Sequence, residues 1–286
     1  PGHRRREKTP AGAVLVRRQS LALLLAIMPT GVEVAAGYTD LMVACRDGAA
    51  DAAAKYLAAG AEVDARNVKG STSLIVASAG GCTECVETLV AAKASIDAVN
   101  AGGLTALMAA AAGNHSTVVA LLTAAGAKTE IATSTGVTSL ILATQKGQSG
   151  SVDALLKAGA AANATTADGN TSVHFASTNG HAAILSLLAA AGADVNATTR
   201  EASSTGLMLA SAKGDTATVD ALVAARADVN IQGRHGITAL MLAARGGHSE
   251  TAARLCDAGA LAGVINEEGL TAVLLAAGNA HADTVA

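Results

Sequence analysis

The chain has 286 residues, of which 51% are hydrophobic but only 1% aromatic, with one Phe, two Tyr and no Trp. This composition excludes a core built around large aromatic side chains, and it favours thin layers of Ala, Leu, Val, Ile and Met packed closely together. The net charge of −3 gives no general reason to expect nucleic acid or an anionic membrane as a partner.

Cysteine content and hydropathy narrow the class of protein further. The four cysteines, Cys45, Cys82, Cys85 and Cys256, are sparse and irregularly spaced. They argue against a disulfide framework and favour an intracellular setting, cytoplasmic or nuclear. No apolar run reaches the length of about 20 residues that a membrane-spanning helix needs.

Residues 1–36 differ in character from the rest of the chain. The basic cluster at residues 4–8 predicts a solvated tail, with nuclear targeting as an alternative. The apolar run at residues 21–27, followed by Gly-Val-Glu-Val at 31–34, predicts a degenerate helix that caps the elements after it. A signal peptide, with two arginines at 17–18 before the short apolar run, is the competing interpretation.

From residue 37 a Gly-x-Thr-x-Leu pattern recurs along the chain, with some substitutions. Successive copies begin 33 residues apart except once, where the spacing is 34. The units start at residues 37, 70, 103, 136, 169, 203, 236 and 269, and the last one is truncated, so we expect a fragment of a longer protein. A spacing this regular is typical of stacked units that bury their faces against one another.

Each unit predicts two short helices. The Thr can cap the first helix, because its hydroxyl can accept a backbone N–H that has no partner in the first turn. A glycine such as Gly81 or Gly147 permits the left-handed backbone that a tight turn between helices requires. Apolar residues then follow at helical spacing, as at Ile184, Leu185 and Leu188.

This pattern resembles the ankyrin repeat, whose 33-residue period and Thr-Pro-Leu-His signature it partly reproduces. Thr171-Ser-Val-His174 is the closest match; no unit has the Pro, and in the other units Met, Ile or Leu replaces the His. The resemblance covers residues 37–286. It implies an all-α repeat solenoid of helix-turn-helix units joined by β-hairpin fingers, and a monomeric protein-binding scaffold. Partners of this family usually bind across the fingertips and the concave face of the first helices.

Residues that could carry chemistry mostly follow the repeat. Cys82 and Cys85 form a Cys-x-x-Cys without a second ligand pair nearby for zinc, and we interpret both as packing residues. Four histidines share one position before the second helix, which predicts a role in the turn: His115, His181, His248 and His281. His174 belongs to the signature and is also interpreted as structural. We therefore expect no catalytic residue, metal site or cofactor, and no enzyme activity.

The positions that vary between units are the candidate binding residues. At the fingertips and the ends of the first helices they are Arg66, Lys69, Lys146, Asn179, Arg200, Glu201, Lys213, Arg234, His235 and Arg245. Among the histidines, His235 alone is predicted to be free to touch a partner. The cations of the later units form a basic stripe, which favours a partner with an acidic or phosphorylated segment. Ordinary solvated charges are the alternative.

Three further alternatives stay open. The array could be a regulatory or targeting region of a larger multidomain enzyme or channel. The resemblance also implies that Asn163, Asn196 and Asn230 could be substrates of an asparaginyl hydroxylase, because they occupy the finger position that such enzymes modify. Finally, the 34-residue unit has one extra residue within 198–203, which could extend its finger toward a partner or be neutral drift.

Overall fold

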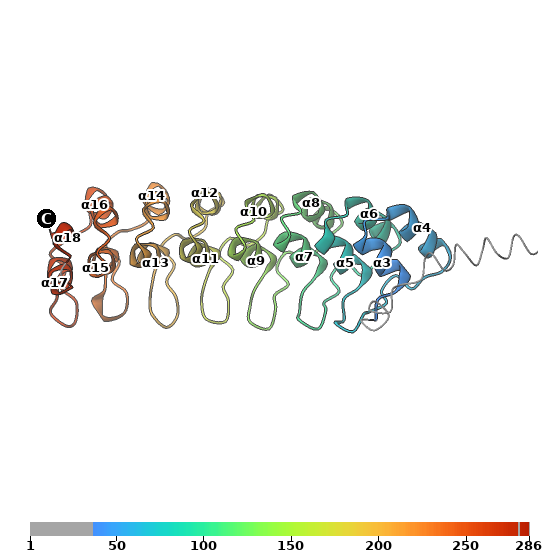
Figure 1. Ribbon diagram of the computed structural model, residues 1–286, viewed down its shortest axis with the longest axis horizontal. Helices are drawn as coiled ribbons and strands as arrows, with labels where there is room; N and C mark the ends of the chain where they lie inside the picture. Colours follow the sequence, from blue (N-terminus) through green and yellow to red (C-terminus); the bar gives the residue numbers. More distant parts are fainter. Residues whose placement is uncertain (1–36, 280, 286) are drawn as a thin grey trace, which may run out of the picture.

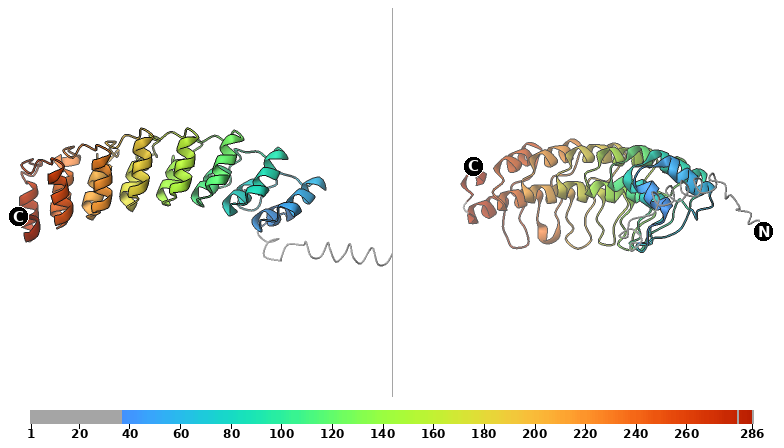
Figure 2. Two further views of the ribbon diagram at one scale, coloured as in Figure 1. Left: turned by 90° about the horizontal axis from the view of Figure 1, so that it is seen from above. Right: turned by 45° about the vertical axis from the view of Figure 1, so that its right-hand side comes forward.

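The computed structural model describes residues 37–279 and 281–285. The chain forms helix pairs that stack side by side (Figure 1). The first helices of the pairs make one row, the second helices make another, and the loops between pairs project beyond the row of first helices (Figure 1). Seen from above, the array follows a shallow arc (Figure 2). The basic tail and capping helix predicted for residues 1–36 lie outside the described residues.

The helices alternate between the two rows. The first helices are α3 (Asp40–Arg46), α5 (Ser73–Gly80), α7 (Ala106–Ala112), α9 (Ser139–Gln145), α11 (Ser172–Asn179), α13 (Gly206–Lys213), α15 (Ala239–Arg245) and α17 (Ala272–Gly278). The second helices are α4 (Ala50–Ala58), α6 (Thr83–Ala91), α8 (Ser116–Ala124), α10 (Ser149–Lys157), α12 (Ala182–Ala190), α14 (Thr216–Ala224), α16 (Ser249–Asp257) and α18 (Ala282–Val285). A short 3-10 turn, η1 (Arg234–Gly236), precedes α15.

A Thr begins every first helix, as the sequence predicts. Its hydroxyl accepts a first-turn backbone N–H in α3, α5, α7, α9, α13, α15 and α17. These N–H groups have no acceptor within the helix, so the Thr hydroxyl gives one of them a hydrogen-bond partner that it would otherwise lack. In α11 the His174 side chain also bonds back to the Thr171 backbone, which completes a capping box.

The first helices end in tight turns. Gly81 follows α5 with a φ of 72°, in the left-handed region that glycine adopts without steric cost. At the matching position of the next pair Asn114 takes a φ of 60°, which asparagine tolerates better than most residues. The turn brings the second helix back against the first.

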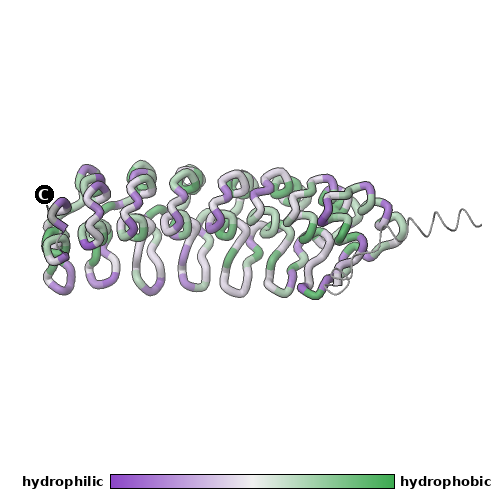
Figure 3. The backbone as a smooth tube through the Cα atoms, in the orientation of Figure 1, coloured by the Kyte–Doolittle hydropathy of each residue, from purple (hydrophilic) through white to green (hydrophobic). Residues whose placement is uncertain are grey.

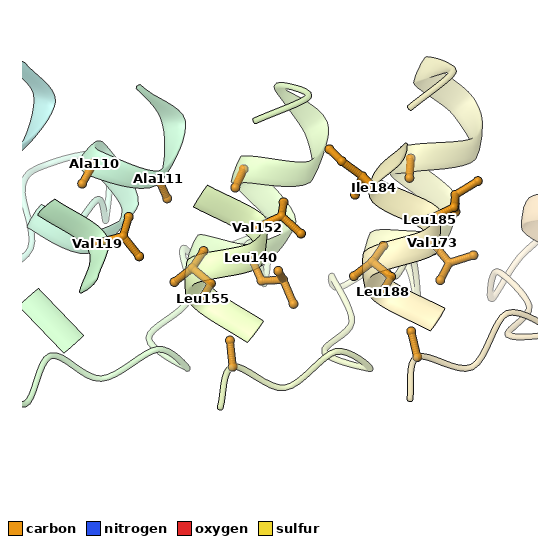
Figure 4. Packing of buried hydrophobic residues seen from close by; sticks show 14 of the residues in the cluster. Ala110, Ala111, Val119, Leu140, Val152, Leu155, Val173, Ile184, Leu185 and Leu188 are labelled. Atoms are coloured by element: carbon orange, nitrogen blue, oxygen red, sulfur yellow. The ribbon is translucent and has the colours of Figure 1, made fainter. Parts of the chain in front are cut away.

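The core is a continuous aliphatic layer between the two rows of helices. Leu155, Leu188 and Leu222 are fully buried at matching positions of α10, α12 and α14. Figure 4 shows Leu155 and Leu188 in equivalent places of successive pairs, with Leu140 and Val173 beside them. Each helix contacts its own partner and the helices of neighbouring pairs. Stability is therefore a sum over neighbouring interfaces, and the predicted all-α repeat solenoid is confirmed.

The segments between pairs are hairpin-shaped loops, called fingers below. They span residues 59–72, 92–105, 125–138, 158–171, 191–205, 225–238 and 258–271. A backbone hydrogen bond closes each tip, for example from Thr166 N–H to the Asn170 carbonyl at 2.9 Å. The expectation of β-hairpins is only partly met: in the described part of the chain the single β-pairing is an isolated bridge between Thr198 and Thr205, because the ladders are too short to form strands.

Candidate functional site

Neighbouring fingers are tied together at their bases. There an Asp, Glu or Asn side chain accepts a backbone N–H from the next finger base. The pairs are Asp64 with Ser95 (2.9 Å), Asp97 with Lys128 (3.0 Å), Glu130 with Ala161 (2.9 Å), Asn163 with Asp194 (2.7 Å), Asn196 with Asp228 (2.8 Å) and Asn230 with Leu261 (2.8 Å). This ladder fixes the spacing of the fingers, so their exposed sides form one surface. The three asparagines considered above as hydroxylation sites hold their amide oxygens in it.

The fingertips are linked as well, by backbone hydrogen bonds from one tip to the next. Arg200 N–H donates to the Asp168 carbonyl at 3.3 Å, and Arg234 N–H donates to the Ala202 carbonyl at 3.1 Å. Arg200 and Arg234 therefore occupy the same place on consecutive tips, and both are exposed. Together, the fingertips and the partly exposed side of the first helices are called the finger-side surface below.

The residue before each second helix often reaches back to the preceding pair. His115 Nε2 lies 3.1 Å from the Ala79 carbonyl, and His248 Nε2 lies 3.2 Å from the Ala212 carbonyl. At the same position Gln148 donates to a carbonyl at the end of α7, 3.2 Å away. Repetition along the sequence predicted a role in the turn for the histidines. The contacts of His115 and His248 extend that role to joining consecutive pairs.

A half-buried apolar position runs along the first helices. It is the fourth residue after each capping Thr, and its members are Val43, Val76, Ala109, Leu142, Phe175, Leu209, Leu242 and Leu275. We call these residues the apolar row. Phe175 is the largest member and the only Phe of the chain. Sequence reasoning missed this residue, although an alignment of the units reveals an aromatic side chain where the others are aliphatic.

The apolar row opens into a pocket beside Phe175. The pocket has a volume of about 520 Å³ and lies between α11, α13 and the fingers 158–171 and 191–205. Its lining residues are Asp168, Asn170, His174, Phe175, Thr178, Thr199, Glu201, Ala202, Ser204 and Leu209. A cavity that combines apolar side chains with a few polar groups is typical of a binding site. Two carboxylates, from Asp168 and Glu201 on consecutive fingers, make it locally acidic.

His174 holds one edge of this pocket in place. Its Nδ1 accepts the Thr171 N–H at 3.1 Å, and its Nε2 lies 3.1 Å from the Ser204 carbonyl in the next finger. Burial has the largest influence on the His174 pKa and lowers it; hydrogen bonding to Ser204 and the charge of Asp194 act in the opposite direction. The neutral ring with its proton on Nε2 satisfies both contacts, since Nδ1 can then accept and Nε2 can donate.

Four of the predicted binding residues are engaged in contacts within the chain. Arg66 Nη1 donates to the Gly70 carbonyl at 2.9 Å and to the Val99 carbonyl of the next finger at 2.6 Å. Asn179 donates to the Gln145 carbonyl, and Lys213 Nζ donates to the Thr178 carbonyl. His235 Nδ1 lies 2.9 Å from Glu267 Oε2. The next fingertip thus brings a carboxylate beside His235, but the ring stays exposed, so its contact with a partner stays a prediction.

The other six predicted binding residues are exposed. Within the described residues, no side-chain hydrogen bond or ion pair is formed by Lys69, Lys146, Arg200, Glu201, Arg234 or Arg245. Lys146 is the C-cap residue after α9 and Arg245 is the last residue of α15, while Arg200 and Arg234 lie on fingertips. Figure 3 shows hydrophilic fingertips before α13, α15 and α17, and a paler tip before α9. We call Lys146, Arg200, Arg234 and Arg245 the uncommitted cations, because their side chains make no hydrogen bond or ion pair within the described residues. Most of them lie in the C-terminal half of the finger-side surface.

The cysteine prediction needs a correction. Cys82 and Cys85, interpreted as separate packing residues, are joined by a disulfide with Cα atoms 5.3 Å apart. The reason is local: Cys82 caps α6 and Cys85 lies in its first turn, which brings the two side chains together. Cys85 is fully buried, as its core position predicts.

Within residues 37–279 and 281–285, no group of three or more His, Cys, Asp or Glu side chains is arranged to hold a metal ion. The helices of this part of the chain are also too short or too polar for any of them to cross a membrane.

Comparison with known proteins bears on the fold. A family model described as ankyrin repeats (3 copies) matches residues 16–100, 41–133, 108–199 and 207–286. Among solved structures, the crystal structure of the human ASB11 ankyrin repeat domain aligns with a TM-score of 0.69 and 22% identity, over 77% of this chain and 98% of that one. No curated protein matches the chain in sequence. At this identity the structural likeness concerns the fold alone.

Proposed function

The chain belongs to the ankyrin repeat family, whose members are generally protein-interaction modules, and from that premise we propose that it is a non-catalytic scaffold that binds a partner protein. The partner lies across the fingertips and the concave side of the first helices. One observation carries this proposal: the half-buried apolar row, with a pocket at Phe175, lies on the same first helices that end near the exposed cations Lys146 and Arg245.

The apolar row supplies the contact area. Interfaces are enriched in aromatic residues at their centres, where a few well-packed side chains carry most of the binding free energy. Phe175 is half-buried in the free chain, so a partner side chain can cover its exposed part. The ladder at the finger bases holds this surface in shape before binding, which lowers the entropy lost on association.

The cations indicate the kind of partner. Arg200, Arg234 and Arg245 can each grip a carboxylate or phosphate with two parallel hydrogen bonds, whereas Lys146 offers a point charge. We therefore propose a partner with an acidic or phosphorylated segment. Asp168 and Glu201 would repel an acidic side chain at the Phe175 pocket itself, so a neutral side chain with a hydrogen-bond donor is expected there.

The setting is proposed from the same premise. We expect a monomeric array acting in the cytoplasm or nucleus, without a cofactor. The alternative is a regulatory or targeting region of a larger multidomain enzyme or channel. In that case the same surface would bind another part of its own polypeptide, and added array would compete with that contact.

Charge reversal tests the role of the cations. The variant carries Arg200→Glu, Arg234→Glu and Arg245→Glu, and the control carries Lys55→Glu, Lys157→Glu and Arg254→Glu on α4, α10 and α16. Both variants change the net charge equally, and the surface ion pairs lost by the control are worth only about 0–1 kcal/mol each. Capture of partners from an extract should fall for the first variant alone, and salt should weaken capture by the unmodified chain. Unchanged capture at low and high salt would contradict the basic stripe.

Substitution of Phe175 tests the apolar contact separately. Phe175→Ala should weaken binding by about 2 kcal/mol or more if the ring lies at the centre of the interface. Phe175→Leu is the matched control, because Leu142 and Leu209 occupy the same position of the neighbouring first helices. It should retain the fold and part of the affinity. Equal affinity of the unmodified chain and both variants would exclude the pocket from the interface.

A further inference from the structure

The disulfide at the start of α6 has two sulfurs in unequal surroundings. Cys82 is half-buried and caps the helix, and its Sγ accepts the Cys85 N–H at 3.2 Å. Cys85 is fully buried among the core residues. Cys82 is therefore the more accessible of the two residues, and it is the one that we expect a dissolved molecule to reach.

The space beside Cys82 is open, unlike that of its counterparts. At the matching position of the next pair the His115 ring packs against Gly81, whose added Cβ would meet the ring at 2.4 Å. The equivalent glycine facing Cys82 is Gly48, and a Cβ there would meet no atom within 4 Å. Among the described residues, no atom fills the room in front of Cys82 that an imidazole fills in the next pair.

This disulfide is poorly suited to stabilising the fold. It joins residues three apart in sequence, so it closes a very short loop and constrains the unfolded chain less than a long-range bridge would. The first turn of α6 already has hydrogen bonds that fix its geometry, including the Val86 N–H to the Cys82 carbonyl at 3.0 Å. Opening the S–S bond would leave those bonds intact.

We propose that Cys82 and Cys85 form a reversible dithiol–disulfide couple that exchanges with low-molecular-weight disulfides such as glutathione disulfide. In the oxidation, the Cys82 thiolate attacks one sulfur of the external disulfide, forms a mixed disulfide and releases one thiolate. Cys85 then loses its proton, its sulfur attacks Cys82, and the second thiolate leaves. Two protein thiols are oxidised, and one external disulfide is reduced to two thiols.

The position of Cys82 favours its role as the attacking sulfur. The N–H groups at the start of a nine-residue helix stabilise a thiolate at the cap, and the Cys85 N–H already points at this sulfur. Glu84 in the same turn opposes this effect, but it is solvent-exposed. The other thiols differ: burial raises the pKa of Cys45 to about 11, which keeps it unreactive, and Cys256 is exposed but has no neighbouring cysteine.

The test follows one peptide of the full chain. The folded protein is equilibrated with mixtures of reduced and oxidised glutathione, quenched with acid, alkylated and digested with trypsin. Cleavage after Lys69 and Lys93 yields a single peptide that carries both Cys82 and Cys85. We expect this peptide to change from doubly alkylated to internally disulfide-bonded as the share of glutathione disulfide rises, and to change back when the mixture is reversed.

Substitutions at the two positions identify the attacking sulfur. Cys85→Ser and Cys85→Val should trap glutathione on Cys82; Ser151 and Val118 are buried at the same position of other pairs, so both variants are expected to fold. Cys82→Ser should leave Cys85 unmodified. Cys256, on a separate peptide, reports the reactivity of an ordinary exposed thiol. A peptide whose state is the same in every mixture, or glutathione on Cys85 as readily as on Cys82, would overturn the proposal.

Discussion

At the scale of single residues, departures from the repeated pattern mark the candidate site. His174 is the clearest of these departures, because the other first helices carry Met, Ile or Leu at its position. Its ring links α11 to the finger 191–205, and so it positions two walls of the Phe175 pocket. Met at the same place can fill the volume but cannot make either hydrogen bond.

The buried imidazole predicts a pH dependence of stability. Burial holds the His174 pKa below its ordinary value of 6.5, so the unfolded chain binds the proton more readily than the folded chain. Stability is therefore expected to fall as the pH drops below 6.5 toward the folded pKa, by at most about 1.4 kcal/mol per pH unit. His174→Met removes this contribution. Chemical denaturation of the unmodified chain and of His174→Met at several pH values below 6.5 should show a steeper loss of stability in the unmodified chain. Identical pH dependences of the two proteins would show that His174 is not the residue responsible.

Ser203 predicts a gain in stability. It stands at the finger end where most neighbouring units have a glycine, and it adopts a φ of 48°. A left-handed conformation costs a residue with a Cβ about 1–2 kcal/mol, and a glycine at this position would avoid that cost. Glycine also has more conformational freedom in the unfolded chain, which offsets part of the gain in stability. Ser203→Gly should therefore raise the free energy of unfolding by about 0.5–1 kcal/mol, measured by urea denaturation. A loss of stability would mean that the serine hydroxyl has a role of its own.

The sequence predicted the roles of residues that act within one helical turn. It missed roles that depend on contacts between residues of neighbouring units. The Thr caps act within one helical turn, so the motif was sufficient to identify them. The pairing of His235 with Glu267 spans 32 residues and depends on how closely two fingertips approach. The engagement of Arg66 with Val99 depends on the same approach. The period of the repeat does not tell how closely neighbouring fingertips approach, so it could not predict these contacts.

At the scale of elements, the finger 191–205 differs from the others. In the finger before it the tip bond joins Thr166 and Asn170, whereas here Thr199 N–H reaches the Ser204 carbonyl at 3.0 Å across one more residue. The insertion therefore widens the tip, which also carries the exposed Arg200 and Glu201. Periodicity predicted the helices and the place of this insertion. It could not predict that the fingers lack regular strands, because strand formation depends on the length of the hydrogen-bonded ladder.

Deletion of Ala202 tests whether the extra residue of this finger serves partner binding or packing. The shortened finger can regain the tip bond that its 33-residue neighbours make, so the melting temperature should change little. Binding should weaken more, because Arg200 and Glu201 would be presented differently beside the Phe175 pocket. Thermal melts and affinity measurements on the same preparations check this. A large fall in melting temperature with unaltered affinity would show that the extra residue serves packing.

At the scale of the whole molecule, the repeated interfaces predict tolerance to removal of a unit. Deleting residues 103–135 brings α6 against α10, and Leu89, Leu122 and Leu155 are fully buried at the same position of α6, α8 and α10. Asp97 could then bond the Ala161 N–H, as Glu130 does in the full chain. Circular dichroism should show similar helical content per residue in the shorter chain. Complete loss of the helical signal would indicate a single cooperative core in place of a solenoid.

The central claim is that a partner protein covers the finger-side surface. Hydrogen–deuterium exchange of the full chain, with and without a captured and purified partner, tests it most directly. We expect slower exchange on binding in residues 196–213 and 230–245, which hold the widened finger, the Phe175 pocket wall and the uncommitted arginines, and no change in the second helices. Protection confined to α4, α6, α8, α10, α12, α14 and α16, with the fingers exchanging as in the free chain, would contradict the account.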